Sequence, residues 1–217
     1  MIAGATGLVG GYLLRELLDS GLFKKVIVIG RNSVGYTHPK LVERLVIFNK
    51  LEQSDSIFKV DAVFCCLGTT LREAGSREQF RLIDFEYCRR IASLAHAQSV
   101  PEFHILSSLG ADPESAFFYS RVKGEIEQAL RQLGFRRMFI YRLSLLLGRR
   151  AQGRPWEALA TVLAGAMSPF LIRGLRKYRP VRAEAVARAM LRKSVEDIDG
   201  EHIVEPPQIK ALAYGVV

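Results

Sequence analysis

The sequence predicts an α/β fold in which helices cover both faces of a parallel sheet. The first observation is that short apolar runs alternate with helical periods along the chain, as in successive βαβ units. The second is a glycine-rich turn, Gly4-Ala5-Thr6-Gly7-Leu8-Val9-Gly10, between an apolar run and a helical period. Glycines there permit a tight turn and close approach to a pyrophosphate, which a helix N-terminus attracts. Together these observations predict a Rossmann-type, doubly wound sheet.

The expected strands are short and apolar, which is typical of strands buried on both faces. They cover residues 2–3, 26–29, 45–48, 61–67, 103–106, part of 137–147 and, near the C-terminus, 202–205. Few residues precede the first glycine, whereas a strand usually has about five or six. We therefore expect either a natural start a few residues upstream or an unusually short first strand.

The expected helices alternate with these strands. They cover residues from about 12–18, 79–98, 119–133, 156–167 and 183–193. Gly134 follows the third of them, where a left-handed residue suits a C-terminal cap. The stretch from about 148 to 217 is too short for an independent domain. Residues 1–217 are therefore expected to form a single domain, with this stretch as a small substrate-side cap and the last elements.

The composition is ordinary for a soluble globular chain of 217 residues, with 49% hydrophobic and 24% charged residues. The three cysteines, two of them adjacent at Cys65 and Cys66, fit neither a disulfide framework nor a metal-ligand spacing. We therefore expect a reducing compartment, a cytoplasmic location, no metal and no secretory leader.

The net charge of +9 leaves two interpretations open. It indicates either an anionic partner, such as a nucleotide phosphate or a lipid surface, or a solvated basic face. The late basic residues lack the interleaved aromatic residues that stack bases, so nucleic-acid binding is not expected. The apolar stretch Trp156–Ile172, with basic residues after it, leaves peripheral membrane contact as an alternative to a cap over the substrate pocket.

A candidate catalytic set occurs in order along the chain. Tyr119 and Lys123 form a Y-x-x-x-K pattern, and residues four apart share one face of a helix. An ammonium beside a phenol favours the phenolate, which makes the tyrosine a candidate general acid–base. Ser107 and Ser108 end an apolar strand shortly upstream, where a hydroxyl can bond a substrate carbonyl. Taken singly, these patterns also fit a surface helix pair and a strand-end turn.

The residues that follow the expected strands at 61–67 and 26–29 indicate where a cofactor would bind and which cofactor it would be. Gly68-Thr69-Thr70 closes the strand at 61–67, where a glycine permits close approach of a cofactor, although an ordinary turn explains it equally well. An NAD site usually has an acidic residue after the second strand, to bond the ribose 2′-hydroxyl. Here the chain has Arg31 and Asn32, and a cation at that place pairs with a 2′-phosphate. NADP(H) is therefore favoured over NAD(H), with a solvent-exposed Arg31 as the alternative.

These motifs together resemble those of the atypical short-chain dehydrogenase/reductases, and more narrowly the Tat-interacting-protein family of NADPH-binding oxidoreductases and its bacterial relatives. The likeness covers roughly residues 2–160, and its motifs are GLFKKVIVIGR (21–31), FCCLGTT (64–70), LSSLGAD (106–112), YSRVKGE (119–125) and Arg142 with the LSLLLG run. Two departures stand out. Ile47-Phe48-Asn49 lacks the acidic residue that members often carry near adenine, and Leu143 stands where members tend to have proline.

The resemblance implies a site. Its catalytic residues would be Tyr119, Lys123 and Ser107. The residues against the cofactor would be Gly4, Thr6, Gly7, Leu8 and Val9 at the pyrophosphate, Arg31 and Asn32 at the 2′-phosphate, and Leu67, Gly68, Ser108 and Arg150 elsewhere along it.

The leading hypothesis is an NADPH-dependent oxidoreductase, a carbonyl or quinone-type reductase. A hydride would pass from the nicotinamide to a carbonyl that Ser107 polarises and Tyr119 protonates. The small-molecule substrate is expected to be apolar. The alternative is an NADPH-binding sensor or scaffold that regulates a partner with little turnover, although such a protein needs no Ser-Tyr-Lys set. The oligomeric state stays open.

Overall fold

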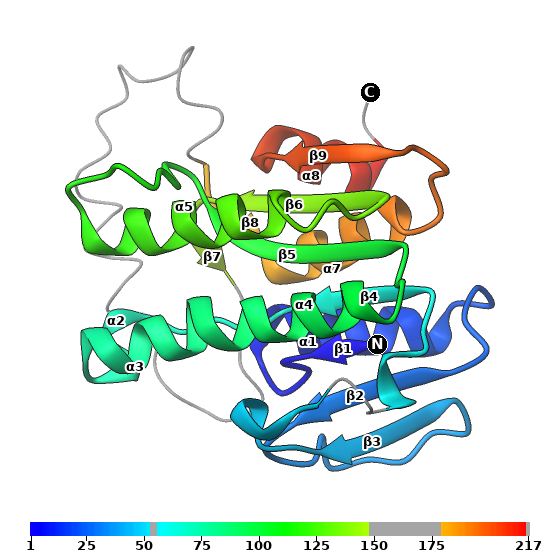
Figure 1. Ribbon diagram of the computed structural model, residues 1–217. Helices are drawn as coiled ribbons and strands as arrows, with labels where there is room; N and C mark the ends of the chain where they lie inside the picture. Colours follow the sequence, from blue (N-terminus) through cyan, green and yellow to red (C-terminus); the bar gives the residue numbers. More distant parts are fainter. Residues whose placement is uncertain (53–55, 148–178, 216–217) are drawn as a thin grey trace.

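The computed structural model describes residues 1–52, 56–147 and 179–215. Within these residues a seven-stranded sheet has the order β3-β2-β1-β4-β5-β6-β9, and every adjacent pair is parallel (Figure 1). The strands are β1 (Ile2–Ala3), β2 (Val26–Gly30), β3 (Leu41–Leu45), β4 (Ala62–Cys65), β5 (Glu102–Ser108), β6 (Arg137–Leu143) and β9 (Gly200–Val204). The predicted α/β, Rossmann-type sheet is confirmed.

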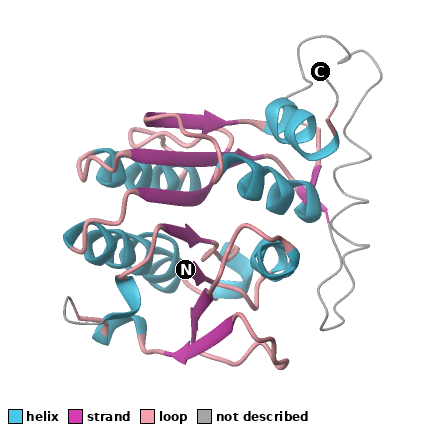
Figure 2. Cartoon of the chain, turned by 90° about the vertical axis from the view of Figure 1, so that its right-hand side faces the viewer, coloured by secondary structure: helices cyan, strands magenta, loops and turns pink. Residues whose placement is uncertain are grey.

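Helices lie on both faces of the sheet, as Figure 2 shows. Those on one face are α1 (Leu8–Asp19), α7 (Ala183–Lys193) and α8 (Pro206–Tyr214), and those on the other are α4 (Cys88–Ala97) and α5 (Phe118–Arg131). Alternate strand residues enter two separate cores, since Ile2 and Phe64 belong to the first and Ala3 and Cys65 to the second. Because both faces are buried, β1, β2 and β4 are apolar throughout.

The third strand differs from the prediction. It pairs with β2 at residues 41–45, whereas we expected residues 45–48. Leu45 and Ile47 are exposed at this edge of the sheet, and Phe48 is buried from a short 3-10 turn. There its ring packs against Tyr87, with 5.2 Å between ring centroids. The apolar run therefore belongs mainly to the turn after the strand, because an edge strand buries less apolar surface than a central one.

The long helix expected at 79–98 contains a wide π-helical segment. α2 (Leu71–Ala74) and α3 (Arg77–Arg81) come first, and the π-helical residues Leu82–Tyr87 join α3 to α4. Such segments often occur at functional sites. Here the segment carries Asp84, which is almost fully buried and faces α5.

The C-terminal part of the described chain completes the sheet. β9 pairs with β6 at the sheet edge, and α7 packs against α1 as the helix expected at 183–193. α8 was not predicted, although proline at its first position and the capping box formed by Glu205 and Gln208 are both typical of a helix start. β7 (Leu146–Leu147) and β8 (Val181–Arg182) form a second, two-stranded sheet. The expected helix at 156–167 and most of the expected cap lie outside the described residues.

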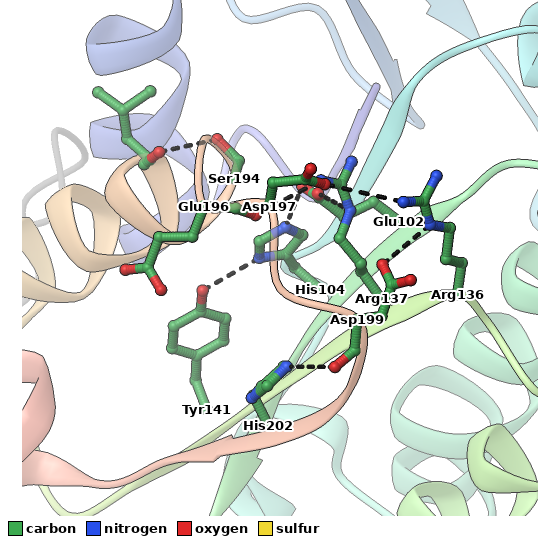
Figure 3. A network of polar contacts seen from close by, with 11 residues as sticks. Glu102, His104, Arg136, Arg137, Tyr141, Ser194, Glu196, Asp197, Asp199 and His202 are labelled. Carbon is green, nitrogen blue, oxygen red and sulfur yellow. Dashed lines mark hydrogen bonds and ion pairs between the residues drawn. The ribbon is translucent and has the colours of Figure 1, made fainter.

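A buried polar cluster joins the amino ends of β5 and β6 (Figure 3). The His104 ring is fully buried, with Nε2 2.7 Å from Glu102 Oε1 and Nδ1 3.0 Å from the Tyr141 hydroxyl oxygen. Arg137 lies between Glu102, with Nε 3.1 Å from Oε2, and Asp197 on the loop between α7 and β9. The cluster lies at the end of the strands remote from the glycine turn, so we assign it to stability.

This cluster predicts a pH-dependent stability. Burial lowers the pKa of His104 below its usual value, although the hydrogen bond to Glu102 opposes the shift. Between that lowered pKa and about 6.5, the unfolded chain binds a proton that the folded chain does not. The contribution of His104 to stability is therefore full at higher pH and is lost as the pH falls through this window. Urea unfolding from about pH 8 to about pH 5 should show a weaker pH dependence in His104→Gln. An identical dependence in both proteins would contradict the assignment.

Candidate cofactor and catalytic site

The glycine turn leaves no room for a side chain at Gly4 or at Gly10. Gly4 has a φ of +87°, and a Cβ added there would lie 2.7 Å from the Cys66 carbonyl oxygen. A Cβ added at Gly10 would lie 2.2 Å from the Gly4 carbonyl oxygen. The backbone of the turn thus packs tightly between β1, α1 and the end of β4. Among the residues that the structure describes, no side chain caps the N-terminus of α1, so its amide groups can meet an anion.

The residues expected at the pyrophosphate surround this helix start. Thr6 is exposed in the turn, Gly7 is the N-cap of α1, and Leu8 is its first residue. The Val9 side chain is buried in the core, so Val9 can offer only its backbone to a ligand. Arg31 and Asn32 are exposed directly after β2, the neighbour of β1, at the same end of the sheet.

The loop that follows β4 is hydrogen-bonded to the π-helical segment. Leu67 is half-buried and Gly68 is exposed. The Thr69 amide donates a hydrogen bond of 2.9 Å to Asp84 Oδ2. The other carboxylate oxygen of Asp84 lies 2.7 Å from Lys123 Nζ. One buried carboxylate therefore connects the loop expected beside the cofactor to the lysine of the Y-x-x-x-K pattern.

Tyr119 and Lys123 lie on one face of α5 and differ in their surroundings. The Lys123 side chain is only 6% exposed, and Nζ also donates to the Leu106 carbonyl oxygen at 3.3 Å. Tyr119 is 37% exposed, and its ring packs on Phe80 with 5.4 Å between centroids. The lysine is thus held inside the protein, while the phenol is accessible.

Charge keeps the buried lysine protonated. Burial alone lowers the pKa of Lys123, but the carboxylate of Asp84 and the phenol of Tyr119 outweigh it and raise the pKa above its usual value. The ammonium is therefore present across the physiological pH range. Tyr119 lies one helical turn before Lys123 on the same face of α5, so the two side chains are neighbours along the helix.

The two serines at the end of β5 have different partners. The Ser107 hydroxyl donates a hydrogen bond of 2.6 Å to Glu127 Oε1, on the next turn of α5 after Lys123. The Ser108 hydroxyl is also buried, but it has no hydrogen-bond partner among the described residues. Ser107 follows Leu106, whose carbonyl oxygen accepts from Lys123, and faces α5, whereas Ser108 pairs in register with Leu143, which belongs to the core on the α1 side of the sheet.

Sequence reasoning missed two acidic residues of this site. Glu127 follows Lys123 by one helical turn, so the pattern Y-x-x-x-K-x-x-x-E was a signal that could have been recognised. Asp84 had no comparable signal, because its place depends on the π-helical segment. Arg150, expected at the cofactor, lies outside the described residues.

Other chemistry is limited in the described part of the chain. Cys65, Cys66 and Cys88 are free and buried, and burial raises the pKa of the Cys66 thiol. Among the described residues, no group of side chains has the arrangement of a metal site. In the same residues, no helix has both the length and the apolar character needed to cross a bilayer.

Comparison with known sequences decides the family. The NAD dependent epimerase/dehydratase family matches residues 1–192. The chain belongs to this family. Protein HTATIP2 of Rattus norvegicus is a relative, 37% identical over 204 residues, which are 92% of this chain and 82% of that protein. Another is protein fmp52, mitochondrial, of Emericella nidulans, 28% identical over 207 residues, or 92% of this chain and 88% of that protein.

Solved structures of other proteins show the same fold. MoeE5, in complex with UDP-glucose and NAD, has a TM-score of 0.71 at 19% identity, over 99% of this chain and 81% of its own. The Bordetella bronchiseptica enzyme WbmH, in complex with NAD⁺, has a TM-score of 0.67 at 16% identity, over 94% of this chain and 74% of its own. The predicted relationship to the atypical short-chain dehydrogenase/reductases is confirmed, and a nicotinamide cofactor is supported.

The fungal relatives correct the expected location. Proteins fmp52 of Emericella nidulans and Aspergillus fumigatus are both named as mitochondrial, which points to mitochondria rather than to the cytoplasm. The cytoplasmic prediction was wrong because it rested on cysteine content. Unpaired cysteines indicate only a reducing environment, which does not distinguish these compartments.

Proposed function

We propose that this chain is an NADPH-dependent reductase of small, apolar carbonyl compounds or quinones. The observation that carries the proposal is the pairing of an accessible tyrosine with a buried, charged lysine on one helix face. The pair lies close to the carboxyl end of β5, the end of a doubly wound sheet at which ligands bind. The exposed Phe117 side chain, two residues before Tyr119, supports an apolar substrate.

The residues present suit a nicotinamide dinucleotide. The turn at Gly4 and Gly10 excludes side chains, and the uncapped start of α1 offers amide groups to a pyrophosphate. Arg31 suits a 2′-phosphate, which would select NADP(H). Leu67 and Gly68 would border the cofactor where the chain leaves β4.

Each side chain of the site would have a separate role in carbonyl reduction. The bound cofactor, when reduced, supplies a hydride to the carbonyl carbon. The Tyr119 hydroxyl would donate its proton to the carbonyl oxygen as negative charge develops there. Lys123, kept protonated beside Asp84, would stabilise the phenolate that remains. A serine hydroxyl at the end of β5 would hydrogen-bond the same oxygen.

Arg31→Ala should weaken NADPH binding about 10- to 100-fold, because a charge-assisted hydrogen bond contributes about 1.5–3 kcal/mol. The affinity for NADH should stay the same, since NADH has no 2′-phosphate. Titration of the cofactor fluorescence measures both constants. Arg89→Ala is the matched control, because Arg89 is exposed on α4 and, in the described part of the chain, forms an ion pair only with the partly exposed Glu86. Equal loss of affinity for NADPH and NADH would exclude this role for Arg31.

A further inference from the structure

We propose that a cavity between α7, β9 and α8 binds a small amphiphilic anion, a carboxylate that carries an apolar chain. Its described lining contains none of the residues assigned above to the cofactor or to the reaction. The inference is therefore independent of the proposed carbonyl reduction, and it adds a second small-molecule site to the fold.

The cavity lies at the edge of the sheet, where the chain leaves α7, forms the edge strand β9 and continues into α8 (Figure 1). Its volume of about 640 Å³ is within the range of about 300–1,000 Å³ that is usual for small-molecule sites. Its lining on α8 extends from Gln208 to Gly215, which is about 10 Å along the helix axis. The cavity therefore suits an elongated molecule better than a compact ion.

Positive charge is available at the end of the cavity that the last turn of α7 forms. Arg192 and Lys193 both line the cavity there. Lys193 Nζ pairs at 2.6 Å with Glu196 Oε2, which compensates its charge. The exposed Arg192 side chain has no ion pair and no hydrogen bond among the described residues. Its guanidinium group can therefore bind a carboxylate.

The acidic residue of the lining does not neutralise Arg192. Glu201, at the start of β9, is already paired with Arg131 on α5, whose Nη2 lies 2.8 Å from Oε1 and whose Nε lies 2.9 Å from both oxygens. The carbonyl groups at the end of α7 carry partial negative charge, so an anion would contact the side chains there rather than the backbone. One uncompensated cation favours a ligand with a single negative charge.

The rest of the cavity is largely apolar. Its lining includes two residues of β9 and two of α8, which are Ile203, Val204, Ala211 and Leu212. An apolar chain that contacts these side chains would be removed from water, which favours binding. A cation at one end and apolar residues along the length together specify an amphiphilic anion.

His202 provides a reporter in the lining of the cavity. Its ring stacks on Phe139 with 5.2 Å between centroids, and its Nε2 lies 3.1 Å from the Asp199 carbonyl oxygen (Figure 3). A carbonyl oxygen only accepts, so Nε2 carries a hydrogen. Nδ1 has no partner among the described residues and can meet a ligand. A molecule in the cavity should therefore shift the NMR signals of this ring.

Isothermal titration calorimetry of the full chain with octanoate tests the site. Octanoate should bind at least about 10-fold more tightly than acetate, which has the charge without the chain. It should also bind at least about 10-fold more tightly than octan-1-ol, which has the chain without the charge. The ring signals of His202 should shift with octanoate, and those of His96 on α4 should not.

Two variants locate the binding. Arg192→Ala should weaken octanoate binding about 10-fold, as loss of a charge-assisted hydrogen bond does. Ala211→Phe should fill the cavity and abolish binding, and its exposed position on α8 should leave Tm unchanged. Arg89→Ala is the matched control and should keep the affinity, because Arg89 is exposed on α4, which covers the other face of the sheet.

Equal octanoate affinity in Arg192→Ala and in the unmodified protein would overturn the proposal. Binding that survives Ala211→Phe would also overturn it, because the ligand would then occupy another site, such as the catalytic one. Failure of octanoate to bind the unmodified protein would have the same consequence. None of these results would affect the proposed reduction, which Tyr119→Phe tests separately.

Discussion

Tyr119→Phe should lower kcat for NADPH-dependent reduction of 1,4-naphthoquinone about 10²- to 10⁴-fold, because the substrate oxygen loses its proton donor. The ring stays, so its packing on Phe80 and the fold should be preserved. The NADPH dissociation constant should change little. Steady-state kinetics and fluorescence titration measure these quantities on the same preparation.

Tyr214→Phe is the control for this variant. Tyr214 is half exposed at the end of α8, a helix that covers the α1 face of the sheet rather than the α5 face. Its loss of a hydroxyl should leave kcat unchanged. Turnover by Tyr119→Phe at the rate of the unmodified protein would remove this tyrosine from the mechanism.

Asp84→Asn should lower the free energy of unfolding by about 3–5 kcal/mol, because it leaves the Lys123 ammonium buried without its counter-charge. The pKa of Lys123 should fall, since burial then acts with less opposition. Activity should decline with it, because a neutral lysine no longer stabilises a phenolate. Urea unfolding at neutral pH measures the loss of stability.

Glu86→Gln is the matched control, because it makes the same chemical change on the same π-helical segment. The Glu86 side chain is 43% exposed and pairs at 3.5 Å with Arg89, which is exposed. Such a surface pair contributes about 0–1 kcal/mol. An equal loss in the free energy of unfolding in the two variants would mean that the buried Asp84–Lys123 pair contributes no more to stability than a surface pair.

Much of the fold could be predicted because its signals are local. The glycine turn needs positive φ and small residues, and the buried strands need apolar residues on both faces, so both are visible in the sequence. The edge strand β3 was predicted at the wrong residues, and the helix α8 was not predicted. β3 was misplaced because an edge strand buries little apolar surface, whereas the start of α8 had recognisable signals, a proline at the first position and a capping box.

The candidate site was only partly predictable for a related reason. Tyr119 and Lys123 share a helix, so their spacing alone brought them together. The partner of Lys123 is Asp84, which is remote in sequence and reaches the lysine only through a π-helical segment that no local pattern announces. The partners of Ser107 were likewise not predictable, because the fold brings Glu127 from a helix and Arg142 from a neighbouring strand.

The most direct test of the central claim is isotope transfer. The purified protein is mixed with NADPH that carries deuterium at the nicotinamide C4 position and with an apolar aldehyde, and the alcohol is examined by mass spectrometry. The proposed reductase predicts an alcohol with deuterium on the former carbonyl carbon, and loss of this product in Tyr119→Phe. Tight NADPH binding without any deuterated alcohol, across aldehydes and ketones of varied size, would contradict the account and favour an NADPH-binding sensor.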